Sequence, residues 1–360
     1  MINIKIASIV GTRPEIIKMQ PIIKEIQKSK HHLNFIHTGQ HYNFNMSNIF
    51  IDDLDLPQPN YFLNVKSGSQ GIQTSRIIAK CEKLLKSGKP DIVLVQGDTN
   101  SALGAAIASS KLGLSIGHIE AGCRSFDKRM PEEINRVLIS DIASLHFAAT
   151  DNCKRNLLNE GIPASQIFVT GHPIVDLIRQ INNRENTLNK SKNKHYALVT
   201  VHRRENIDDK DRISKILTAF DQLSQKMPVI FPCHPHTKRQ ILRFSLEKYV
   251  KNIRMIKPVD YIQSLTLCKN AKFVLTDSGG IQQEAALLCT PCITLRKTTE
   301  WIETVKLGIN FLAGCGSGCI KENIRYVERN YDDIQQRFKS SRYLFGKVGV
   351  SKRILKIIEK

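Results

Sequence analysis

Three carboxylates follow closely behind strand-like runs of the sequence: Asp98 in QGDT, Glu120 in HIEAG and Glu132 in RMPEE. Loops at the carboxyl ends of parallel strands meet at one edge of a sheet, so these side chains could converge. Carboxylates confined together raise one another's pKa, which suits them to accept and donate protons near neutral pH. Taken singly, each has a structural alternative: Asp98 as a helix cap, Glu120 paired with Arg124, and Glu132 at a helix start after Pro131.

The stretch LTDSGGIQQEA, residues 275–285, joins an apolar strand to a helix through a glycine pair. Ser278 could simply cap this helix, while Gly279 and Gly280 supply backbone angles that other residues resist. The functional alternative is a phosphate cradle, because bare backbone amides at a helix N-terminus bind anions. Glu284, one turn into the helix, could then accept hydrogen bonds from ribose hydroxyls.

Cations and histidines occupy similar positions. In GTRPEIIKM, Arg13 follows a strand and Lys18 lies a turn into the next helix, so both could face one ligand; a helix entry with a surface arginine is the alternative. His202 in VHRREN and His234 in CHPH each follow a strand, although a lone histidine is more often hydrogen-bonded scaffold. The sequence lacks the helical His spacing of a zinc site and the nucleophile elbow, so we predict no metal site here.

The net charge of +20, from 53 Lys and Arg against 33 Asp and Glu, indicates an anionic ligand. A binder of single-stranded nucleic acid would interleave its basic groove with stacking aromatics, but aromatic residues make up only 6% of the chain. We therefore expect a lysine-rich solvated surface around a site for one small anionic substrate, and no nucleic-acid partner.

Nine cysteines are too sparse for a secreted disulfide framework, so free thiols are expected. Two short-spaced pairs, Cys289 with Cys292 and Cys315 with Cys319, would suit a four-cysteine zinc site. Against that, Cys292 lies in the strand-like run PCITL, where a buried thiol is commoner. No apolar run approaches the roughly 20 residues that span a bilayer, and the chain goes directly into a strand, so we expect a cytoplasmic protein without a membrane partner.

The length of 360 residues exceeds the size at which one core keeps growing, so two domains are expected. Short β-branched runs alternate with helical stretches, which predicts an α/β fold with parallel sheets. The polar stretch 179–195 is typical of a domain linker or a long surface segment. We predict two Rossmann-like domains facing an interdomain cleft: residues 1–175 with the carboxylates, residues 176–345, and a C-terminal helix at 346–360 that packs back on the first domain. The expected strands are INIKIASIV, LNFIHT, DIVLVQG, LSIGHI, LHFAAT and IFVTG, then YALVTV, PVIFPC, IRMIKP, KFVLTD, CITLR and NFLAG.

Taken together and in order, the motifs GTRPEIIKM, HTGQHYNFNM, QGDTN, HIEAGCRSFDKRMPEEINR, HRREN, TDSGGIQQEA and TLRKTTEW resemble the non-hydrolysing UDP-N-acetylglucosamine 2-epimerase family. The resemblance covers nearly the whole chain. It implies a two-domain fold of the glycosyltransferase-B type that binds UDP mainly in its C-terminal domain and forms homodimers. It also implies interconversion of UDP-N-acetylglucosamine and UDP-N-acetylmannosamine without nicotinamide, metal or other cofactor.

The resemblance also implies roles for individual residues. By motif, catalytic roles fall to Asp98, Glu120, Glu132 and His202, and substrate contacts to Arg13, Lys18, His234, Ser278, Gly279, Gly280 and Glu284. Gln40 and His41 lie in the segment that, in bacterial members of the family, helps to bind a second UDP-sugar as an activator. In the implied reaction, proton abstraction at C2 accompanies departure of UDP from C1, since C2 has no adjacent carbonyl to stabilise an anion. The resulting 2-acetamidoglucal regains its proton on the other face, which requires two proton-handling groups.

Some positions depart from the family pattern. Well-known members have Arg where this chain has Trp301, and a related branch with Trp acts on modified sugars such as UDP-2,3-diacetamido-2,3-dideoxyglucuronate. His172 replaces a usual Asn, and FGKVGVSKRI replaces an acidic Gly-Asp-Gly segment near the C-terminus. An epimerase of such a modified sugar is therefore one alternative. The others are a retaining glycosyltransferase of the same fold, which would not need all three carboxylates, and a UDP-sugar- or RNA-binding protein without catalysis.

Overall fold

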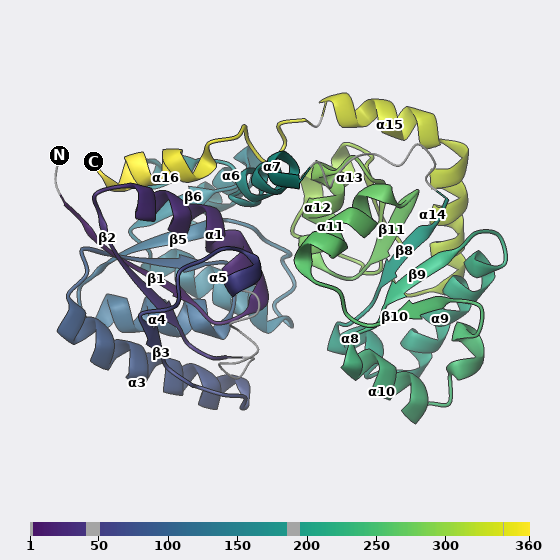
Figure 1. Ribbon diagram of the computed structural model, residues 1–360, viewed down its shortest axis with the longest axis horizontal. Coiled ribbons are helices and arrows are strands. Elements are labelled where there is room, and N and C mark those ends of the chain that lie inside the picture. Colours follow the sequence, from purple (N-terminus) through teal and green to yellow (C-terminus); the bar gives the residue numbers. More distant parts are fainter. Residues whose placement is uncertain (1–2, 41–50, 186–194, 341) are drawn as a thin grey trace. The chain divides into compact units, whose positions relative to one another are not determined.

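The computed structural model describes residues 3–40, 51–185, 195–340 and 342–360. Contacts divide the chain into two compact units, one made of Met1–Gln180 with Leu344–Lys360 and the other of Ile181–Tyr343 (Figure 1). Each unit holds one parallel sheet with interleaved helices, which confirms the predicted α/β class with two Rossmann-like domains. No helix in the described part of the chain is long and apolar enough to cross a bilayer.

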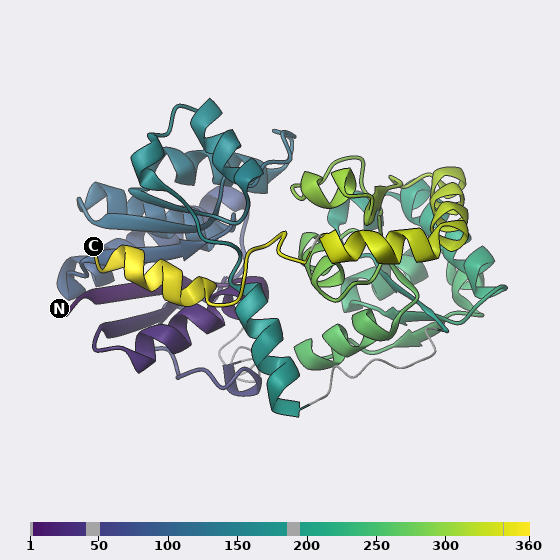
Figure 2. The same ribbon diagram turned by 90° about the horizontal axis from the view of Figure 1, so that it is seen from above.

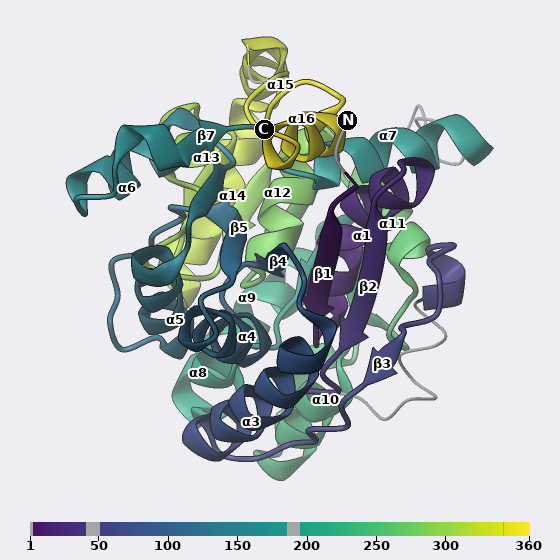
Figure 3. The ribbon, with the colours of Figure 1, turned by 90° about the vertical axis from the view of Figure 1, so that its left-hand side faces the viewer.

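The first unit is built on a seven-stranded sheet in the order β3-β2-β1-β4-β5-β6-β7. Its strands are β1 (Lys5–Val10), β2 (His32–His37), β3 (Tyr61–Phe62), β4 (Ile92–Gln96), β5 (Ser115–Ala121), β6 (Leu145–Ala148) and β7 (Ile167–Val169). Its helices are α1 (Arg13–Lys28), α3 (Gln70–Gly88), α4 (Asn100–Lys111), α5 (Pro131–Ile142), α6 (Asp151–Asn159), η1 (Ala164–Gln166), α7 (Ile174–Glu185) and α16 (Val350–Ile358). Figure 3 shows α3, α4 and α5 on one face of this sheet and α1 with α16 on the other. Strand β4, IVLVQ, is buried along its whole length, as expected for a parallel strand covered on both faces.

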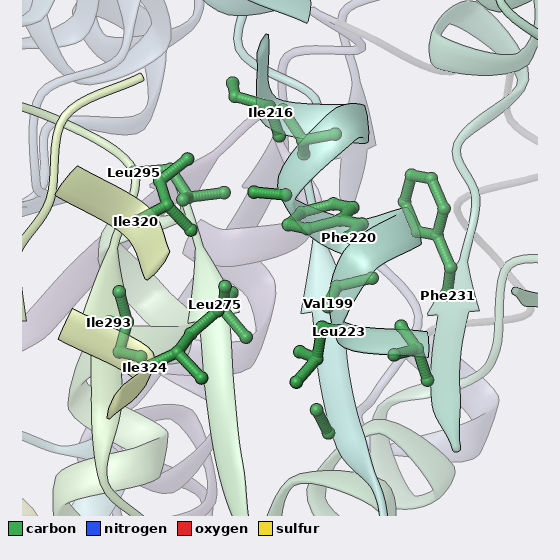
Figure 4. Packing of buried hydrophobic residues seen from close by; sticks show 14 of the residues in the cluster. Val199, Ile216, Phe220, Leu223, Phe231, Leu275, Ile293, Leu295, Ile320 and Ile324 are labelled. Carbon is green, nitrogen blue, oxygen red and sulfur yellow. The ribbon is translucent and has the colours of Figure 1, made fainter. Parts of the chain in front are cut away.

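The second unit repeats this plan with a six-stranded sheet in the order β10-β9-β8-β11-β12-β13. Its strands are β8 (Ala197–Thr200), β9 (Val229–Pro232), β10 (Arg254–Ile256), β11 (Phe273–Thr276), β12 (Cys292–Thr294) and β13 (Asn310–Leu312). Its helices are α8 (Arg204–Ile207), α9 (Lys210–Ser224), α10 (Pro235–Arg243), η2 (Glu247–Val250), α11 (Tyr261–Asn270), α12 (Gly279–Leu287), α13 (Ile302–Lys306), α14 (Ser317–Arg329) and α15 (Tyr331–Ser340). Figure 4 shows the core of this unit, where Phe220 of α9 and Ile324 of α14 pack against strand residues such as Val199, Leu275 and Ile293.

The strand order reverses between β1 and β4 in the first unit and between β8 and β11 in the second. In open parallel sheets, the loops after the strands at such a reversal form the ligand site. The predicted GTRPE and QGDT motifs follow β1 and β4, and the VHRREN and TDSGG motifs follow β8 and β11. The topology alone therefore places the polar motifs at the two positions where this fold binds ligands.

The C-terminal helix α16 belongs to the first unit, where it lies along α1 (Figure 2). Asp176, near the start of α7, caps α16 by accepting hydrogen bonds from the backbone N–H groups of Gly349 (2.6 Å), Val350 (3.3 Å) and Ser351 (2.8 Å). The Arg353 guanidinium also donates to the carbonyl oxygen of Thr170. The segment around residues 170–176 and the chain's end are thus held to each other.

The polar stretch 179–195, expected to be a domain linker or a long surface segment, is helical at its start. Helix α7 continues to Glu185, so the predicted boundary at residue 175 falls inside it, and residues 186–194 lie outside the described residues. The reason is the apolar stripe formed by Ile174, Leu177 and Ile181, which is buried and spaced at helical intervals. This stripe starts before the polar stretch and carries the helix into it.

Candidate active site

Glu120 is the centre of the polar cluster in the first unit. Its side chain is only 8% exposed, and its Oε2 atom accepts hydrogen bonds from Lys18 Nζ (2.6 Å), His172 Nε2 (2.9 Å) and the side-chain amide of Gln96. Burial by itself would raise the pKa of this carboxyl, but Lys18 and His172 outweigh it and hold the pKa below its usual range. Glu120 is therefore an ionised acceptor at ordinary pH.

The backbone at Glu120 is strained. Its φ is +68°, in the left-handed region, and the register between β5 and β6 shifts between Ile119 and Ala121. This is a β-bulge at the end of strand β5, and bulges re-aim side chains next to functional sites. Strain of this kind persists only where the surrounding structure holds it, and the bonds to the carboxylate provide such a hold.

Asp98 lies in the loop after β4, the strand beside β5. Its carboxylate contacts Arg136 of α5, and its carbonyl oxygen accepts a hydrogen bond from the Asn135 side chain (2.8 Å). Burial raises the pKa of Asp98 although Arg136 lowers it, and the nearby negative charges of Glu120 and Glu132 raise it further. The expected rise in pKa thus occurs at Asp98 but not at Glu120. At Glu120, Lys18 and His172 make the net shift of the pKa a decrease.

Glu132 lies in the first turn of α5, where its negative charge suits the helix N-terminus and acts on Asp98. The cluster therefore brings together Asp98, Glu120, Glu132 and Lys18. The structural alternatives fare differently. Glu120 does not pair with Arg124, which instead binds Glu160 (2.6 and 2.7 Å), and the cap of α4 is Thr99.

Arg13 and Gln40, two further predicted site residues, also belong to the first unit. Arg13 is the first residue of α1, after the N-cap Thr12. Gln40 is buried, and its side-chain oxygen accepts hydrogen bonds from the Ser101 N–H (2.9 Å) and hydroxyl (2.7 Å). The side-chain oxygen of Gln40 therefore stabilises the first turn of α4. His41, the other residue of the expected activator site, lies outside the described residues.

Glu15 holds the two loops of this cluster together. It is fully buried, and its carboxylate accepts hydrogen bonds from the Gly11 N–H (3.0 Å) and from the hydroxyls of Thr12 (2.8 Å) and Thr99 (2.7 Å). Burial raises the pKa of Glu15 to about 7 despite these hydrogen bonds, which lower it. The loop after β1 is thereby fixed to the first turn of α4, next to Asp98.

In the second unit, Asp277 ties together the two loops at the reversal of strand order. It is fully buried and accepts hydrogen bonds from the backbone N–H groups of His202 and Arg203 and from the side chain of Asn206. The imidazole of His202 lies with Nδ1 3.4 Å from Asp277 Oδ1 and is 44% exposed. Asp277 therefore fixes where His202 emerges, while the ring itself is open to a ligand.

The start of α12 has the geometry of a phosphate cradle. Ser278 is the N-cap, its hydroxyl accepting from the Ile281 N–H, so the amides of Gly279 and Gly280 lie in the first turn. A Cβ at residue 279 would come within 2.7 Å of Glu300 Oε1, whereas one at residue 280 would meet nothing closer than 3.8 Å. The first glycine is thus required by packing, and the second leaves the amides uncovered, as anion binding requires.

The other predicted residues of this unit have clear structural positions. Glu284 is buried in the second turn of α12. His234 is the N-cap of α10. Burial and the positive charges of His202 and His236 lower its pKa, so His234 and His202 lie close to each other. Cys289, Cys292, Cys315 and Cys319, whose spacing would also suit a zinc site, are free thiols, and Cys292 is buried in β12 as the sequence suggested.

A family model described as UDP-N-acetylglucosamine 2-epimerase matches residues 24–359. The chain belongs to the UDP-N-acetylglucosamine 2-epimerase family. It is 46% identical over 323 residues to the UDP-N-acetylglucosamine 2-epimerase of Methanocaldococcus jannaschii, covering 86% of this chain and 88% of that protein. It is 37% identical over 361 residues to the UDP-2,3-diacetamido-2,3-dideoxy-D-glucuronate 2-epimerase of Pseudomonas aeruginosa, covering 99% of each.

Solved structures agree. The crystal structure of the M. jannaschii UDP-GlcNAc 2-epimerase in complex with UDP-GlcNAc and UDP matches at a TM-score of 0.88 and 43% identity, over 99% of both chains. The epimerase-family chain therefore has the glycosyltransferase-B type of fold, as predicted, and is an isomerase by family.

Several residues that hold the predicted site residues in the two units were missed from the sequence. His172 was noted only as a departure from the family pattern, and Gln96, Arg136 and Asp277 were not singled out for a role. Gln96 is the last residue of β4 and Asp277 immediately follows β11, a position that could have flagged both. His172 contacts Glu120 from 52 residues away in the sequence, and Arg136 contacts Asp98 from 38 residues away. No local sequence pattern predicts either contact.

Proposed function

We propose that the chain is a non-hydrolysing UDP-N-acetylglucosamine 2-epimerase that interconverts UDP-N-acetylglucosamine and UDP-N-acetylmannosamine. The observation that carries this proposal is the pair of carboxylates at the ends of neighbouring strands, Asp98 in the loop after β4 and Glu120 in β5, whose pKa values shift in opposite directions: that of Asp98 is raised and that of Glu120 is lowered. Titratable groups whose environments drive their pKa values apart are suited to act as acid and base. A 2-epimerase needs both, because the proton leaves one face of the sugar and returns to the other.

The chemistry follows from where the electrons go. A carboxylate takes the proton from C2 while the C1–O bond breaks, so the electron pair of the C2–H bond becomes the C1–C2 double bond of 2-acetamidoglucal and UDP leaves with the pair of the C1–O bond. An acid then returns a proton to C2 on the opposite face, and UDP re-adds at C1. The ionised Glu120 would accept the proton from C2, and Asp98 would return one to the other face. The negative charge of Glu132 helps to raise the pKa of Asp98, which favours that role.

Negative charge gathers on UDP during this reaction, and the second unit supplies groups that suit it. The uncovered amides at the start of α12 would hold the diphosphate, and Glu284 would accept from the ribose. His202, with its imidazole exposed and its backbone fixed by Asp277, would stabilise the departing UDP, with His234 beside it. Arg13 and Lys18 of α1 would contact the substrate, as the resemblance to the family implies.

A modified UDP-sugar is the second candidate substrate. Trp301 favours it, since the sequence resemblance associates Trp at this position with epimerases of diacetamido-uronate sugars, and one such enzyme is 37% identical to this chain. Trp301 is buried, with 1% exposure, behind Glu300 and Gly279, so it acts on a substrate only through the residues that it packs against.

We further propose that the enzyme is a cytoplasmic homodimer. Helix α5 exposes Ile134, Val137 and Leu138, which share one face of the helix at spacings of three and four residues. An exposed apolar stripe of this kind supports self-association, and light scattering at graded concentrations tests it. The nine free cysteines support a reducing compartment.

A proton NMR time course with UDP-N-acetylglucosamine in deuterated water tests the reaction. We expect the manno epimer with deuterium at C2. Release of N-acetylmannosamine and UDP would contradict a non-hydrolysing enzyme. If neither UDP-N-acetylglucosamine nor the diacetamido-uronate nucleotide is converted, epimerase activity is contradicted. Glu120→Gln should abolish turnover while UDP binding stays nearly unchanged. Asp55→Asn is the matched control, because Asp55 pairs with Lys24 on the same helix as Lys18 but is exposed.

A further inference from the structure

The hydrogen bonds to Glu120 are distributed unequally between its two oxygens. Lys18, Gln96 and His172 all donate to Oε2, and among the described residues no donor contacts Oε1. A carboxylate held in this way has one oxygen fixed and one oxygen left to meet a ligand. The three donors come from α1, from β4 and from the loop after β7, so each fixes the carboxylate from a different direction.

The proton on His172 can be located from its two ring contacts. Nδ1 lies 3.1 Å from the backbone nitrogen of Ile174, and a backbone N–H can only donate, so Nδ1 accepts and carries no proton. The proton therefore sits on Nε2, from which it is donated to Glu120. The ring is neutral, in keeping with burial, which lowers the pKa of His172.

The ring is also held in place by the end of the chain. The N–H of His172 donates to the carbonyl oxygen of Phe345 (2.8 Å), and the two rings meet edge to face with centroids 6.5 Å apart. The preceding residue, Gly171, has a φ of +89°, and a Cβ there would lie 2.7 Å from the same carbonyl oxygen. This close approach lets the segment before α16 pack directly over the histidine.

We propose that His172 is a positioning residue that orients Glu120 for the reaction, fixing Oε2 through its Nε2–H so that Oε1 faces the reacting sugar. It is not a catalytic residue, because its side chain has no exposed surface and so does not reach a substrate. This inference rests on the proposed function, in which Glu120 transfers a proton. It assigns a role to a histidine at a position where the sequence resemblance leads one to expect asparagine.

Two substitutions separate the two contacts of the ring. In His172→Gln the longer side chain places an amide N–H near the position of Nε2, which keeps the donor to Glu120. In His172→Asn the shorter side chain keeps an acceptor for the Ile174 N–H but stops short of Glu120. His172→Leu removes both contacts. A hydrogen bond to a charged group is worth ~1.5–3 kcal/mol, so kcat should fall about 10- to 100-fold in the Leu and Asn variants.

Three measurements decide the proposal. KM and the affinity for UDP should stay within about two-fold of wild type in every variant, and His172→Gln should recover most of the lost kcat. Wild-type kcat in the Leu or Asn variant, or a Gln variant as slow as the Leu variant, would overturn the proposal. If these variants do not fold, long-range ¹H–¹⁵N NMR of histidine-labelled wild-type protein tests the same geometry. A neutral Nε2–H tautomer is expected, and an imidazolium or an Nδ1–H tautomer at neutral pH would overturn it.

Failure of the inference and failure of the proposed function are distinguishable. If the wild-type protein does not epimerise any UDP-sugar, the proposed function fails, yet the NMR tautomer still reports on His172. If the wild-type protein epimerises and the substitutions leave kcat unchanged, only the positioning role fails.

Discussion

Replacing Lys18 by methionine tests the central ion pair of the cluster. Lys18 Nζ lies 2.6 Å from Glu120 Oε2, and the two side chains are 14% and 8% exposed. With an effective dielectric constant of about 20, two unit charges at that distance attract each other by roughly 6 kcal/mol before desolvation is subtracted. Removing one partner of a buried pair leaves the other charge uncompensated, so Lys18→Met should lower the free energy of unfolding by about 3–5 kcal/mol.

The double variant separates lost attraction from a stranded charge. Glu120→Gln should cost a similar amount by leaving the ammonium unpaired, while Lys18→Met with Glu120→Gln removes both charges and should cost little more than either single change. We expect a coupling free energy of about 2–4 kcal/mol. Lys24→Met is the matched control, because Lys24 lies on the same helix but pairs with Asp55, which is 62% exposed, so it should cost less than about 1 kcal/mol.

Urea unfolding can measure these values unit by unit. The chain has one tryptophan, Trp301, which lies in the second unit, so its fluorescence follows that unit while far-UV circular dichroism follows both. Only the dichroism transition of the first unit should shift. Strictly additive costs in the double variant, with a coupling near zero, would refute the claim that Lys18 and Glu120 form a buried pair.

Three further predictions follow from other buried carboxylates. The pKa of Glu15 rises from 4.5 to about 7 on folding, so the folded state binds the extra proton between these values, and the stability that Glu15 contributes below pH 4.5 is lost as the pH rises through 7. Relative to Glu15→Gln, the wild-type free energy of unfolding should fall by ~3 kcal/mol over this range; parallel pH profiles would contradict this. Asp277→Asn replaces a carboxylate oxygen that accepts from two backbone N–H groups by an amide nitrogen that can only donate. The second unit should lose about 3 kcal/mol of stability, measured by Trp301 fluorescence, and UDP binding measured by calorimetry should weaken. An unshifted unfolding transition would show that the buried charge is dispensable. Asp176→Ala removes the acceptor for three amides of α16, and hydrogen exchange of residues 344–360 should accelerate while that of α9 does not.

The sequence predicts the architecture well because most strands are short apolar runs that alternate with helical stretches along the chain. Each of the twelve expected strand runs overlaps a strand of the structure. The one strand not expected is β3, Tyr61–Phe62, which is two residues long and has no pattern of its own to detect. The helical start of the polar stretch 179–195 was not expected, because the polar residues there obscure the apolar stripe that begins at Ile174.

The site is predictable only in part, for a physical reason. Loops after parallel strands must meet, so the sequence can place Asp98, His202 and the glycine pair. It cannot say which charges become partners, because Lys18 and His172 reach Glu120 from 102 and 52 residues away. Since those partners decide the sign of the pKa shift, the protonation of Glu120 follows from tertiary contacts alone. The left-handed backbone of Glu120 likewise depends on those contacts.

The first unit is assembled from both ends of the chain, and this has a consequence during synthesis. Between Gln180 and Leu344, a ribosome must add 164 residues, which at about 5–20 residues per second takes on the order of 10 to 30 s. Throughout that interval Phe345 and α16 do not yet exist, so Asp176 has no amides to bind and His172 has no carbonyl to hold its backbone. The nascent chain can finish the second unit before the first, and the first unit becomes complete only when residues 344–360 leave the exit tunnel. Loss of residues 344–360 would therefore leave a chain that carries every carboxylate of the cluster but lacks the Phe345 carbonyl that holds the backbone of His172, one of the three donors to Glu120.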